Sequence, residues 1–369
     1  MKAPMTISTR WIRGAQNFAA AQQLWDSLLP SGPLDPFRTH AWAKVWLDTA
    51  GKGAEPQLLC IGNPPRILLP LAAKRQFGLR RLEILGHGVS DYQSPLWKKP
   101  NQHDLCAVGR AIREASASFD HVNLRSLHLT PEQALILTKE LGPRSHLRVH
   151  ETCPAIRIGS SWDEYLQGRS RSFRKLLRRA GRRAHAYGEL EIQREIPRDE
   201  IFEEMLLVER ASWKWRRGRS LLRDPGTAQF IRQIVGSEEI DQEIWTLRID
   251  GNLVAYALIL LGEGRRLYYL PSFRETFPST GAHLLAVIIQ DTFEEGYKYF
   301  DFLQGDEDYK LLWSNTSDQV FEISAGFGAK GDCANAITAL HWSASRSTTY
   351  RNAWLRVRKA YGQLKSPKA

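Results

Sequence analysis

Apolar runs alternate with turn residues through the first half of the chain, after two amphipathic stretches. The spacing predicts one helix over 15–29, ended at Pro30, and a second that begins near Thr39. Three short runs rich in Leu and Ile are separated by Gly, Asn and Pro, at 57–61, 66–73 and 81–85. Such runs predict an antiparallel meander. A helix over 102–116 and a strand over 119–124 complete this unit.

The second half repeats this order of elements. Asp250-Gly251 separates the apolar runs 243–249 and 252–261, and this dipeptide is a strong signal for a hairpin turn. A third run at 266–270 extends the predicted meander. The helix expected next covers 282–295, and a strand over 298–303 follows it.

The pairs Phe119-Asp120 and Phe300-Asp301 occupy the same place in the two halves, so we interpret the chain as a weak internal repeat of one mixed α/β unit. Two more strands are predicted at 320–324 and near Phe327, and a helix over 333–364. That helix is basic because it carries Arg351, Arg356, Arg358 and Lys359.

Length and composition limit the class of protein. A chain of 369 residues, 43% hydrophobic and 25% charged, predicts two globular domains. No apolar run reaches the roughly 20 residues of a membrane-spanning helix, and the start has no secretory signal, so the cytoplasm is the expected location. Four scattered cysteines and no His cluster predict neither disulfides nor a metal site. The net charge of +11 favours an anionic partner.

Several segments, taken in order, resemble one family. The run Phe300-Asp-Phe-Leu-Gln-Gly-Asp-Glu-Asp-Tyr-Lys310 with Trp313 is the clearest of them. The others are Ser170–Arg179, the Asp250-Gly251 hairpin, Phe277-Pro-Ser-Thr-Gly281, Pro36–Trp42 and Leu68-Leu-Pro-Leu71. The ordered set resembles the CelD/BcsL type of GNAT acyltransferases, which are related to the FemABX aminoacyl transferases. The resemblance covers most of the chain.

The resemblance implies a mixed α/β (α+β) fold of two tandem GNAT-like domains, each a mixed, mostly antiparallel sheet flanked by helices. We expect a non-catalytic domain over 1–150, a catalytic domain over 151–330 and a basic helical segment over 331–369. It also implies transfer of an acyl group, usually from acetyl-CoA, to an amine. Members are associated with cellulose and other envelope polysaccharides, whereas FemABX relatives use aminoacyl-tRNA.

The donor site is expected where a Gly-containing loop opens a helix, because backbone N–H groups and the helix dipole bind pyrophosphate there. The segment Ser279-Thr280-Gly281-Ala282-His283 fits this description, although it matches the usual GNAT signature poorly and an ordinary helix cap would look similar. The residues Tyr268-Tyr269-Leu270 stand at the end of a predicted strand. The resemblance implies that this strand corresponds to the one whose edge holds the pantetheine arm in GNAT proteins.

The catalytic candidates follow the last strand of the motif. Tyr309 is the expected general acid for the leaving thiolate, and Lys310 the group that stabilises the donor, as the resemblance implies. The base stays open among four side chains and a water relay; the four are Asp301, Asp306, Glu307 and His283. A carboxylate after a strand more often caps the next helix.

A basic helix and an aromatic cluster are the candidate substrate-binding features. Eight basic residues and no acidic one lie between Arg169 and Arg183, on a stretch whose apolar residues keep helical spacing. Within it, the candidate contacts are Arg171, Arg174 and Arg178. Trp213 and Trp215 stand beside Lys and Arg, which suits stacking on a sugar or base.

Three functions remain open from the sequence. The first is acyl-CoA-dependent N-acyl transfer to a small-molecule or saccharide amine; the second is aminoacyl transfer from tRNA; the third is a catalytically silent adaptor that binds an anionic partner. An anionic membrane surface is an open partner, and no stable DNA partner is expected. The first half has Asn123-Leu-Arg-Ser126 where the second has Tyr309-Lys310, so we expect it to lack an active site and to help form the acceptor groove.

Overall fold

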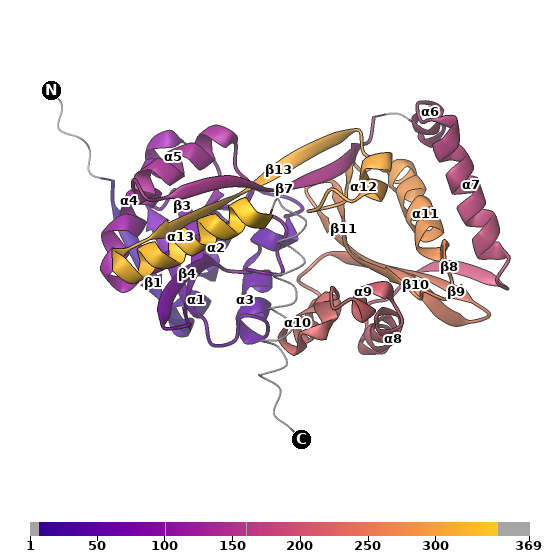
Figure 1. Ribbon diagram of the computed structural model, residues 1–369, viewed down its shortest axis with the longest axis horizontal. Coiled ribbons are helices and arrows are strands. Elements are labelled where there is room, and N and C mark those ends of the chain that lie inside the picture. The colour runs from indigo at the N-terminus through magenta and orange to yellow at the C-terminus, as the bar shows by residue number, and fades with distance from the viewer. Residues whose placement is uncertain (1–6, 100, 160, 346–369) are drawn as a thin grey trace, which may run out of the picture.

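A single sheet of 13 strands joins both halves of the chain in the computed structural model, which describes residues 7–99, 101–159 and 161–345 (Figure 1). The first half supplies β1 (Thr9–Arg13), β2 (Glu55–Ile61), β3 (Ile67–Gln76), β4 (Leu79–Ile84), β5 (Leu96–Trp97), β6 (His121–Leu127) and β7 (His146–Arg157). The second supplies β8 (Leu190–Glu195), β9 (Gln242–Ile249), β10 (Asn252–Gly262), β11 (Arg265–Phe273), β12 (Tyr299–Asp301) and β13 (Thr316–Gly326). Their order is β1-β2-β3-β4-β6-β13-β7-β12-β11-β10-β9-β8, with β5 paired to β3.

Each half contains an antiparallel meander, then a helix, then a strand parallel to the last strand of the meander. In the first half these are β2-β3-β4, α4 (Gln102–Glu114) and β6. In the second they are β9-β10-β11, α11 (Thr280–Glu294) and β12. Asp250 and Gly251, both with positive φ, make the hairpin turn between β9 and β10 as predicted. The mixed, mostly antiparallel sheet agrees with tandem GNAT-like units.

The two halves exchange their last strands. β13 pairs with β6, and β7 pairs with β12, while β7 and β13 also pair with each other at the centre of the sheet. The prediction of two strands, at 320–324 and near Phe327, was wrong. The chain forms one continuous strand there, Thr316–Gly326. The residues Val320–Ala325 are buried without a break, the polar Glu322 and Ser324 included, because this part of β13 lies between β6 and β7 at the centre of the sheet.

Helices cover both faces of the sheet. One face carries α1 (Ala15–Ala20), α2 (Gln22–Ser27), α3 (His40–Asp48), α8 (Asp199–Arg210), α9 (Trp213–Arg216) and α10 (Pro225–Val235). The other carries α4, α5 (Pro131–Leu141), α6 (Trp162–Gln167), α7 (Arg171–His185) and α11, with the short α12 (Asp308–Trp313) beside them. The predicted helix over 15–29 is two helices, because the chain tightens at Ala21, whose N–H bonds to the Phe18 carbonyl three residues back.

The helix α13 (Gly328–Ser345) follows β13 and packs against it. It begins five residues before the predicted start at Cys333. The rest of the predicted helix, with the basic residues Arg351, Arg356, Arg358 and Lys359, lies outside the described residues.

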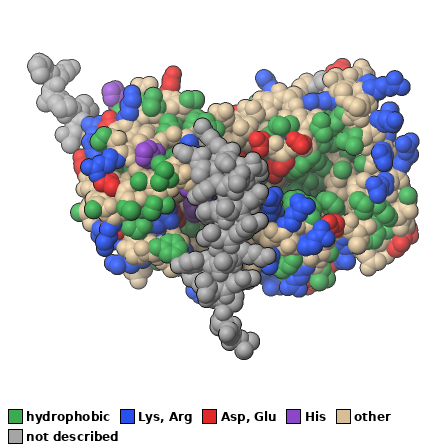
Figure 2. Space-filling view, in the orientation of Figure 1, with side chains coloured by type: hydrophobic (Ala, Val, Ile, Leu, Met, Phe, Trp, Pro, Cys, Tyr) green, Lys and Arg blue, Asp and Glu red, His purple; other side chains and the backbone are tan. Residues whose placement is uncertain are grey.

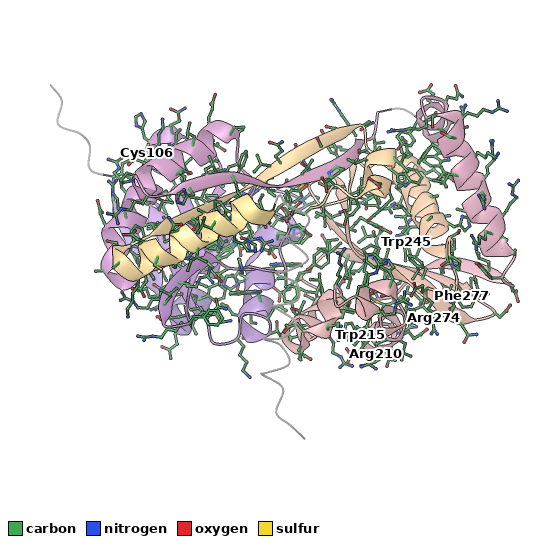
Figure 3. All side chains as sticks on the ribbon, in the orientation of Figure 1. Cys106, Arg210, Trp215, Trp245, Arg274 and Phe277 are labelled. Atoms are coloured by element: carbon green, nitrogen blue, oxygen red, sulfur yellow. The ribbon has the colours of Figure 1, made fainter. Side chains whose placement is uncertain are left out.

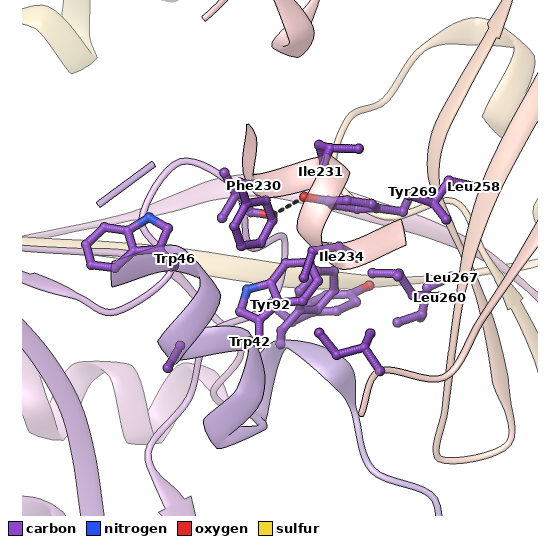
Figure 4. Packing of buried hydrophobic residues seen from close by; sticks show 14 of the residues in the cluster. Trp42, Trp46, Tyr92, Phe230, Ile231, Ile234, Leu258, Leu260, Leu267 and Tyr269 are labelled. Atoms are coloured by element: carbon purple, nitrogen blue, oxygen red, sulfur yellow. Dashed lines mark hydrogen bonds between the residues drawn. The ribbon is translucent and has the colours of Figure 1, made fainter. Parts of the chain in front are cut away.

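The core on one face is shared by both halves. Trp42 and Trp46 of α3 belong to the same buried cluster as Phe230 and Ile234 of α10, and the rings of Trp42 and Phe230 meet edge to face at 4.9 Å (Figure 4). On the opposite face the halves keep separate cores, one under α4 and α5 and one under α7 and α11. The shared core fixes the two halves against each other, so the second half presents its helices on a rigid base.

Candidate functional site

A cavity opens in the second half where two parallel strands part. β11 and β12 pair only over Arg265–Leu267 and Tyr299–Asp301, and β11 then continues to Phe273. A cavity of about 550 Å³ lies at this end of β11, lined by residues of α7, α9, β10, β11, α11 and α12. Figure 2 shows a hollow with hydrophobic side chains in this half, with acidic groups at one edge and basic groups at another. The described lining residues all come from the second half, so the expected part of the first half in an acceptor groove stays a prediction.

The start of α11 forms one wall of the cavity. Ser279, Gly281 and Ala282 line it, and Ser279 has a left-handed backbone with φ 80° and makes no side-chain cap. Among the described residues nothing accepts a hydrogen bond from the N–H of Gly281 or Ala282. Arg179 and Arg183 of α7 line the same cavity. Two free amides and two guanidinium groups therefore surround a site suited to an anion.

Gly281 has a packing reason as well. A Cβ atom at this position would lie 2.7 Å from the ring of Phe273, which also lines the cavity. Any side chain at 281 would displace that ring. The glycine is thus explained by contact within the protein, and its presence alone does not identify an anion site.

Four residues of the predicted donor site lie outside the cavity lining, namely Thr280, His283, Tyr269 and Leu270. Thr280 is buried and its hydroxyl donates to the Phe277 carbonyl at 2.7 Å. His283 is outside the cavity lining and faces His185 of α7, with ring centroids 5.5 Å apart; burial lowers the pKa of His283. Tyr269 donates to the Val89 carbonyl at 2.7 Å in the shared core.

A bulge in β11 decides which tyrosine reaches the cavity. Leu258 and Ile259 of β10 pair with Leu270 and Tyr268, so Tyr269 is skipped in the register. As a result Tyr269 and Leu270 join the shared core, while Tyr268 lines the cavity. The sequence pattern could not locate this extra residue.

Tyr309 and Lys310 point to different surroundings although they are neighbours. Tyr309 lines the cavity with 40% of its surface exposed; desolvation of the hydroxyl, and then the charge of Glu307, raises its pKa, and the hydroxyl is protonated at neutral pH. Lys310 is buried outside the lining, where its ammonium donates to the Gln304 carbonyl at 2.5 Å and pairs with Glu307 at 3.0 Å. Those bonds fix the loop before α12, and so the position of Tyr309.

Asp301 lies outside the cavity and connects the two halves. Its carboxylate accepts hydrogen bonds from the Tyr92 hydroxyl at 3.0 Å, from Arg265 at 3.0 Å and from the Leu303 N–H at 2.8 Å. Burial raises the pKa of Asp301, while the Leu303 N–H and Arg265 act in the opposite direction. Asp306 and Glu307 are exposed on the loop before α12.

The substrate-binding candidates separate into two groups. Trp213 lines the cavity, whereas Trp215 packs against the shared core with Arg210 over its ring at 5.9 Å (Figure 3). Arg171 and Arg178 line a separate groove on the outer surface of α7. Arg174 lines neither the cavity nor that groove.

Lys214 is a cavity residue that the sequence did not single out. Its ammonium donates to the Pro271 carbonyl of β11 at 2.7 Å, beyond the last residue of β11 that pairs with β12. Burial lowers the pKa of Lys214, and the nearby Glu209 acts in the opposite direction. The sequence signal for Lys214 is its position between Trp213 and Trp215, which were both predicted to contact the substrate.

A polar group under the cavity was missed for a different reason. Glu209 is fully buried, and one carboxylate oxygen accepts from the hydroxyl of Tyr256, a lining residue, at 3.2 Å. Its other oxygen and the buried Ser272 hydroxyl have no hydrogen-bond partner among the described residues. Glu209 is one of several glutamates on an amphipathic helix, so no sequence signal distinguishes it.

Comparison with known proteins identifies the domain around this cavity. Residues 171–311 match the family model for an acetyltransferase (GNAT) domain, a range that begins with α7 and ends within α12. No curated protein sequence matches the chain. No helix within residues 7–99, 101–159 and 161–345 has the length and apolar character needed to cross a bilayer.

Solved structures share the fold over most of the chain. FemX is 14% identical with a TM-score of 0.59, covering 82% of this chain and 95% of that one. The C-terminal domain of a putative lysylphosphatidylglycerol synthetase from Agrobacterium fabrum is 12% identical with a TM-score of 0.56, covering 88% and 97%. A tandem GNAT protein from the clavulanic acid biosynthesis pathway is 13% identical with a TM-score of 0.50, covering 87% and 99%. The second half therefore matches a GNAT domain, and the chain as a whole shares its fold with these three proteins.

Proposed function

We propose that the cavity of the second half transfers an acyl group from a CoA thioester to an amine. The observation that carries the proposal is the convergence on one cavity of an open strand end, two unbonded helix N–H groups and a protonated tyrosine. The finer assignment to the CelD/BcsL type, with an amino sugar of an envelope polysaccharide as acceptor, rests on the sequence resemblance alone.

The donor fits the side of the cavity next to α7 and α11. Arg179 and Arg183 would bind the phosphates together with the N–H groups of Gly281 and Ala282, since a helix start and two guanidinium groups both favour an anion. Backbone groups at the open end of β11 would orient the thioester carbonyl. The thioester itself supplies the activated acyl group.

The chain's own residues would supply the proton steps. Tyr309 lines the cavity, carries its proton at neutral pH as a tyrosine ordinarily does, and would donate it to the sulfur that leaves. Tyr256, which lines the cavity from β10, donates to the buried carboxylate of Glu209, whose second oxygen has no hydrogen-bond partner among the described residues. That pair would accept the proton that the attacking amine releases. Lys214 keeps the Pro271 carbonyl engaged and so would hold the end of β11 in place.

Isothermal titration with acetyl-CoA and with free CoA tests the donor class. We expect binding at roughly micromolar concentration, a common range for substrates of such enzymes. Changing Arg179 and Arg183 to Gln should weaken it by about tenfold or more, because each removes a charge-assisted hydrogen bond. The matched control changes Arg171 and Arg178 to Gln, which removes the same charge from the outer groove and should leave binding unchanged.

Aminoacyl transfer from tRNA is the second candidate, favoured by the fold shared with FemX. It predicts no heat with CoA and an activity that ribonuclease treatment abolishes. Absence of binding to both donors would instead support a catalytically silent adaptor. The double Arg179 and Arg183 variant is a sharper probe than a Gly281 variant, because a side chain at 281 would displace Phe273 whatever the ligand.

A further inference from the structure

Four exposed cations form a stripe along the outer side of α7. Arg171, Lys175, Arg178 and Arg182 follow one another at steps of four, three and four residues, which places them on one side of a helix, and with Ser172 they line a surface groove. None of the four forms a salt bridge with a described residue. Figure 2 shows basic side chains along the edge of the molecule where Figure 1 places α7.

The stripe contrasts with ion-pair networks elsewhere in the same domain. Other arginines of the same domain sit in networks of carboxylates: Arg266 pairs with Glu243, Asp291 and Glu295. Arg248 likewise pairs with Glu195 and Glu204. Four like charges within about 17 Å of helix repel one another, so the stripe is suited to an external anion.

Exposed leucines border the cavity beside this stripe. Leu176 of α7 lines the cavity and is 51% exposed, and Leu312 of α12 lines it and is 50% exposed. Leu311 is also 50% exposed. The same helix therefore carries cations on its outer side and an apolar residue at the cavity mouth.

We propose that α7 docks this protein on an anionic lipid surface. The stripe lies against the headgroups, and Leu176, with Leu311 and Leu312 of α12, contacts the apolar boundary beneath them. The cavity mouth then faces the membrane plane. Docking of this kind is independent of the acyl transfer proposed above and goes beyond it.

Lipid fits these residues better than nucleic acid does. Surfaces for single-stranded RNA combine cations with aromatic faces on which bases stack. The one aromatic residue of α7, Phe173, is buried in the domain core beside the cavity. Exposed leucines add nothing to phosphate binding, whereas at a bilayer they remove apolar surface from water.

Acidic residues in the loop before α12 and at the first position of α12 limit the docking face. Asp306, Glu307 and Asp308 are all exposed there, and they would be repelled by anionic headgroups. The surface that docks is therefore α7 together with the Leu311 and Leu312 end of α12, while the acidic start of α12 opposes docking. Neutralising Asp306 and Asp308 should strengthen docking.

Cosedimentation with vesicles tests the proposal directly. The full chain should bind vesicles of equal parts phosphatidylcholine and phosphatidylglycerol, should not bind phosphatidylcholine alone, and should lose affinity as salt is raised. Changing Arg171, Lys175, Arg178 and Arg182 to Gln should weaken binding at least about 30-fold, given the contribution of each charge near an anionic surface. The control changes Lys52, Lys74, Arg75 and Lys98 to Gln, four exposed cations of the first half, and should bind nearly as well as the unaltered chain.

A second pair of variants separates the apolar contact from the charge. Leu176→Ser with Leu311→Ser keeps every cation and should weaken vesicle binding several-fold, whereas Asp306→Asn with Asp308→Asn should strengthen it. Thermal unfolding confirms that each variant is folded. Equal losses in the stripe and control variants would overturn the proposal in favour of net charge alone, and so would absence of vesicle binding together with tight, salt-sensitive binding to transfer RNA.

Discussion

The two halves of the molecule have the same arrangement of strands, in which the last strand of the meander separates from its parallel neighbour. They differ in what fills the gap between those two strands, β4 and β6 in one half and β11 and β12 in the other. In the first half, the chain after β4 returns to β6 at Gln93. The Gln93 N–H donates to the Ser126 carbonyl at 2.9 Å, its carbonyl accepts from the His128 N–H at 2.7 Å, and its side-chain amide donates to the Leu85 carbonyl at 3.1 Å. The gap is closed by the protein itself. In the second half the corresponding gap stays open as the cavity.

The helices differ at the same place. In the first half α5, 11 residues long, packs against α4 over the separate core. In the second half α12 has only 6 residues, and α7 packs against α11 instead. In the second half the basic helix α7, between β7 and β8, packs on α11 and lines the cavity. The comparison teaches that the repeated fold supplies a place where strands part, and that the surrounding segments decide whether this place is filled or left open as a cavity.

The largest expected effect is on Tyr309, which has no counterpart in the closed half. Tyr309→Phe should lower kcat by about 10² to 10⁴, the usual contribution of a positioned acid, with little change in KM. Steady-state kinetics with the donor identified by titration measures it. Tyr299→Phe is the control, because Tyr299 lies on β12 outside the cavity. Full activity of the Tyr309 variant would remove the proposed acid.

The next effect concerns the strand exchange that joins the halves. Glu322 of β13 accepts hydrogen bonds from Arg148 of β7, with Nε at 2.9 Å, and lies 3.3 Å from His150. Burial alone would raise the pKa of Glu322, but His150 and Arg148 outweigh it and lower the pKa to about 2. Glu322→Gln should lower the free energy of unfolding by about 2–4 kcal/mol at pH 7, because the buried His150 and the partly buried Arg148 lose their anion.

The pH dependence of that loss has a definite sign. A carboxylate with a lowered pKa stabilises the fold above its unfolded value of 4.5, and this stabilisation is lost as the pH falls from there toward about 2. Denaturant unfolding should therefore show the difference between Glu322→Gln and the unaltered chain shrinking below pH 4.5. The exposed Glu132→Gln serves as the control. A difference that stays constant down to pH 3 would contradict the assigned ion pairs.

Lys214 tests what holds the open gap. Lys214→Met should lower kcat/KM by about 10- to 30-fold, because the Pro271 carbonyl loses a charged donor. Burial lowers the pKa of Lys214, so its charge is lost at a lower pH than that of an exposed lysine, and the advantage over the Met variant should fall as the pH rises through that value. Lys139→Met, on the exposed side of α5, is the matched control. Equal activity of Lys214→Met at every pH would show that the end of β11 needs no such support.

The order of elements was predictable because it follows from local patterns. The two meanders and the hairpin at Asp250-Gly251 are encoded in short apolar runs and turn residues. The start of α11 was predictable near residue 282 for the same reason; Ser279, Gly281 and Ala282 line the cavity, and their part in donor binding stays a prediction. The sequence predicted Tyr269 as a donor-site residue, but a bulge in β11 directs its side chain into the shared core. That bulge depends on pairing with β10, which no local pattern reveals. Glu209 and the pairing of β13 with β6 depend on contacts between distant parts of the chain.

The smallest expected effect lies at the closure of the first half. Gln93→Ala removes the side-chain bond to the Leu85 carbonyl and should lower the free energy of unfolding by about 1 kcal/mol. The bonds of the Gln93 backbone to Ser126 and His128 remain, so the gap should stay closed and kcat/KM should not change. Denaturant unfolding and steady-state kinetics measure the two quantities. If titration of this variant showed a second molecule of CoA bound per chain, the closure would depend on one side chain, and the two halves would differ far less than their backbones indicate.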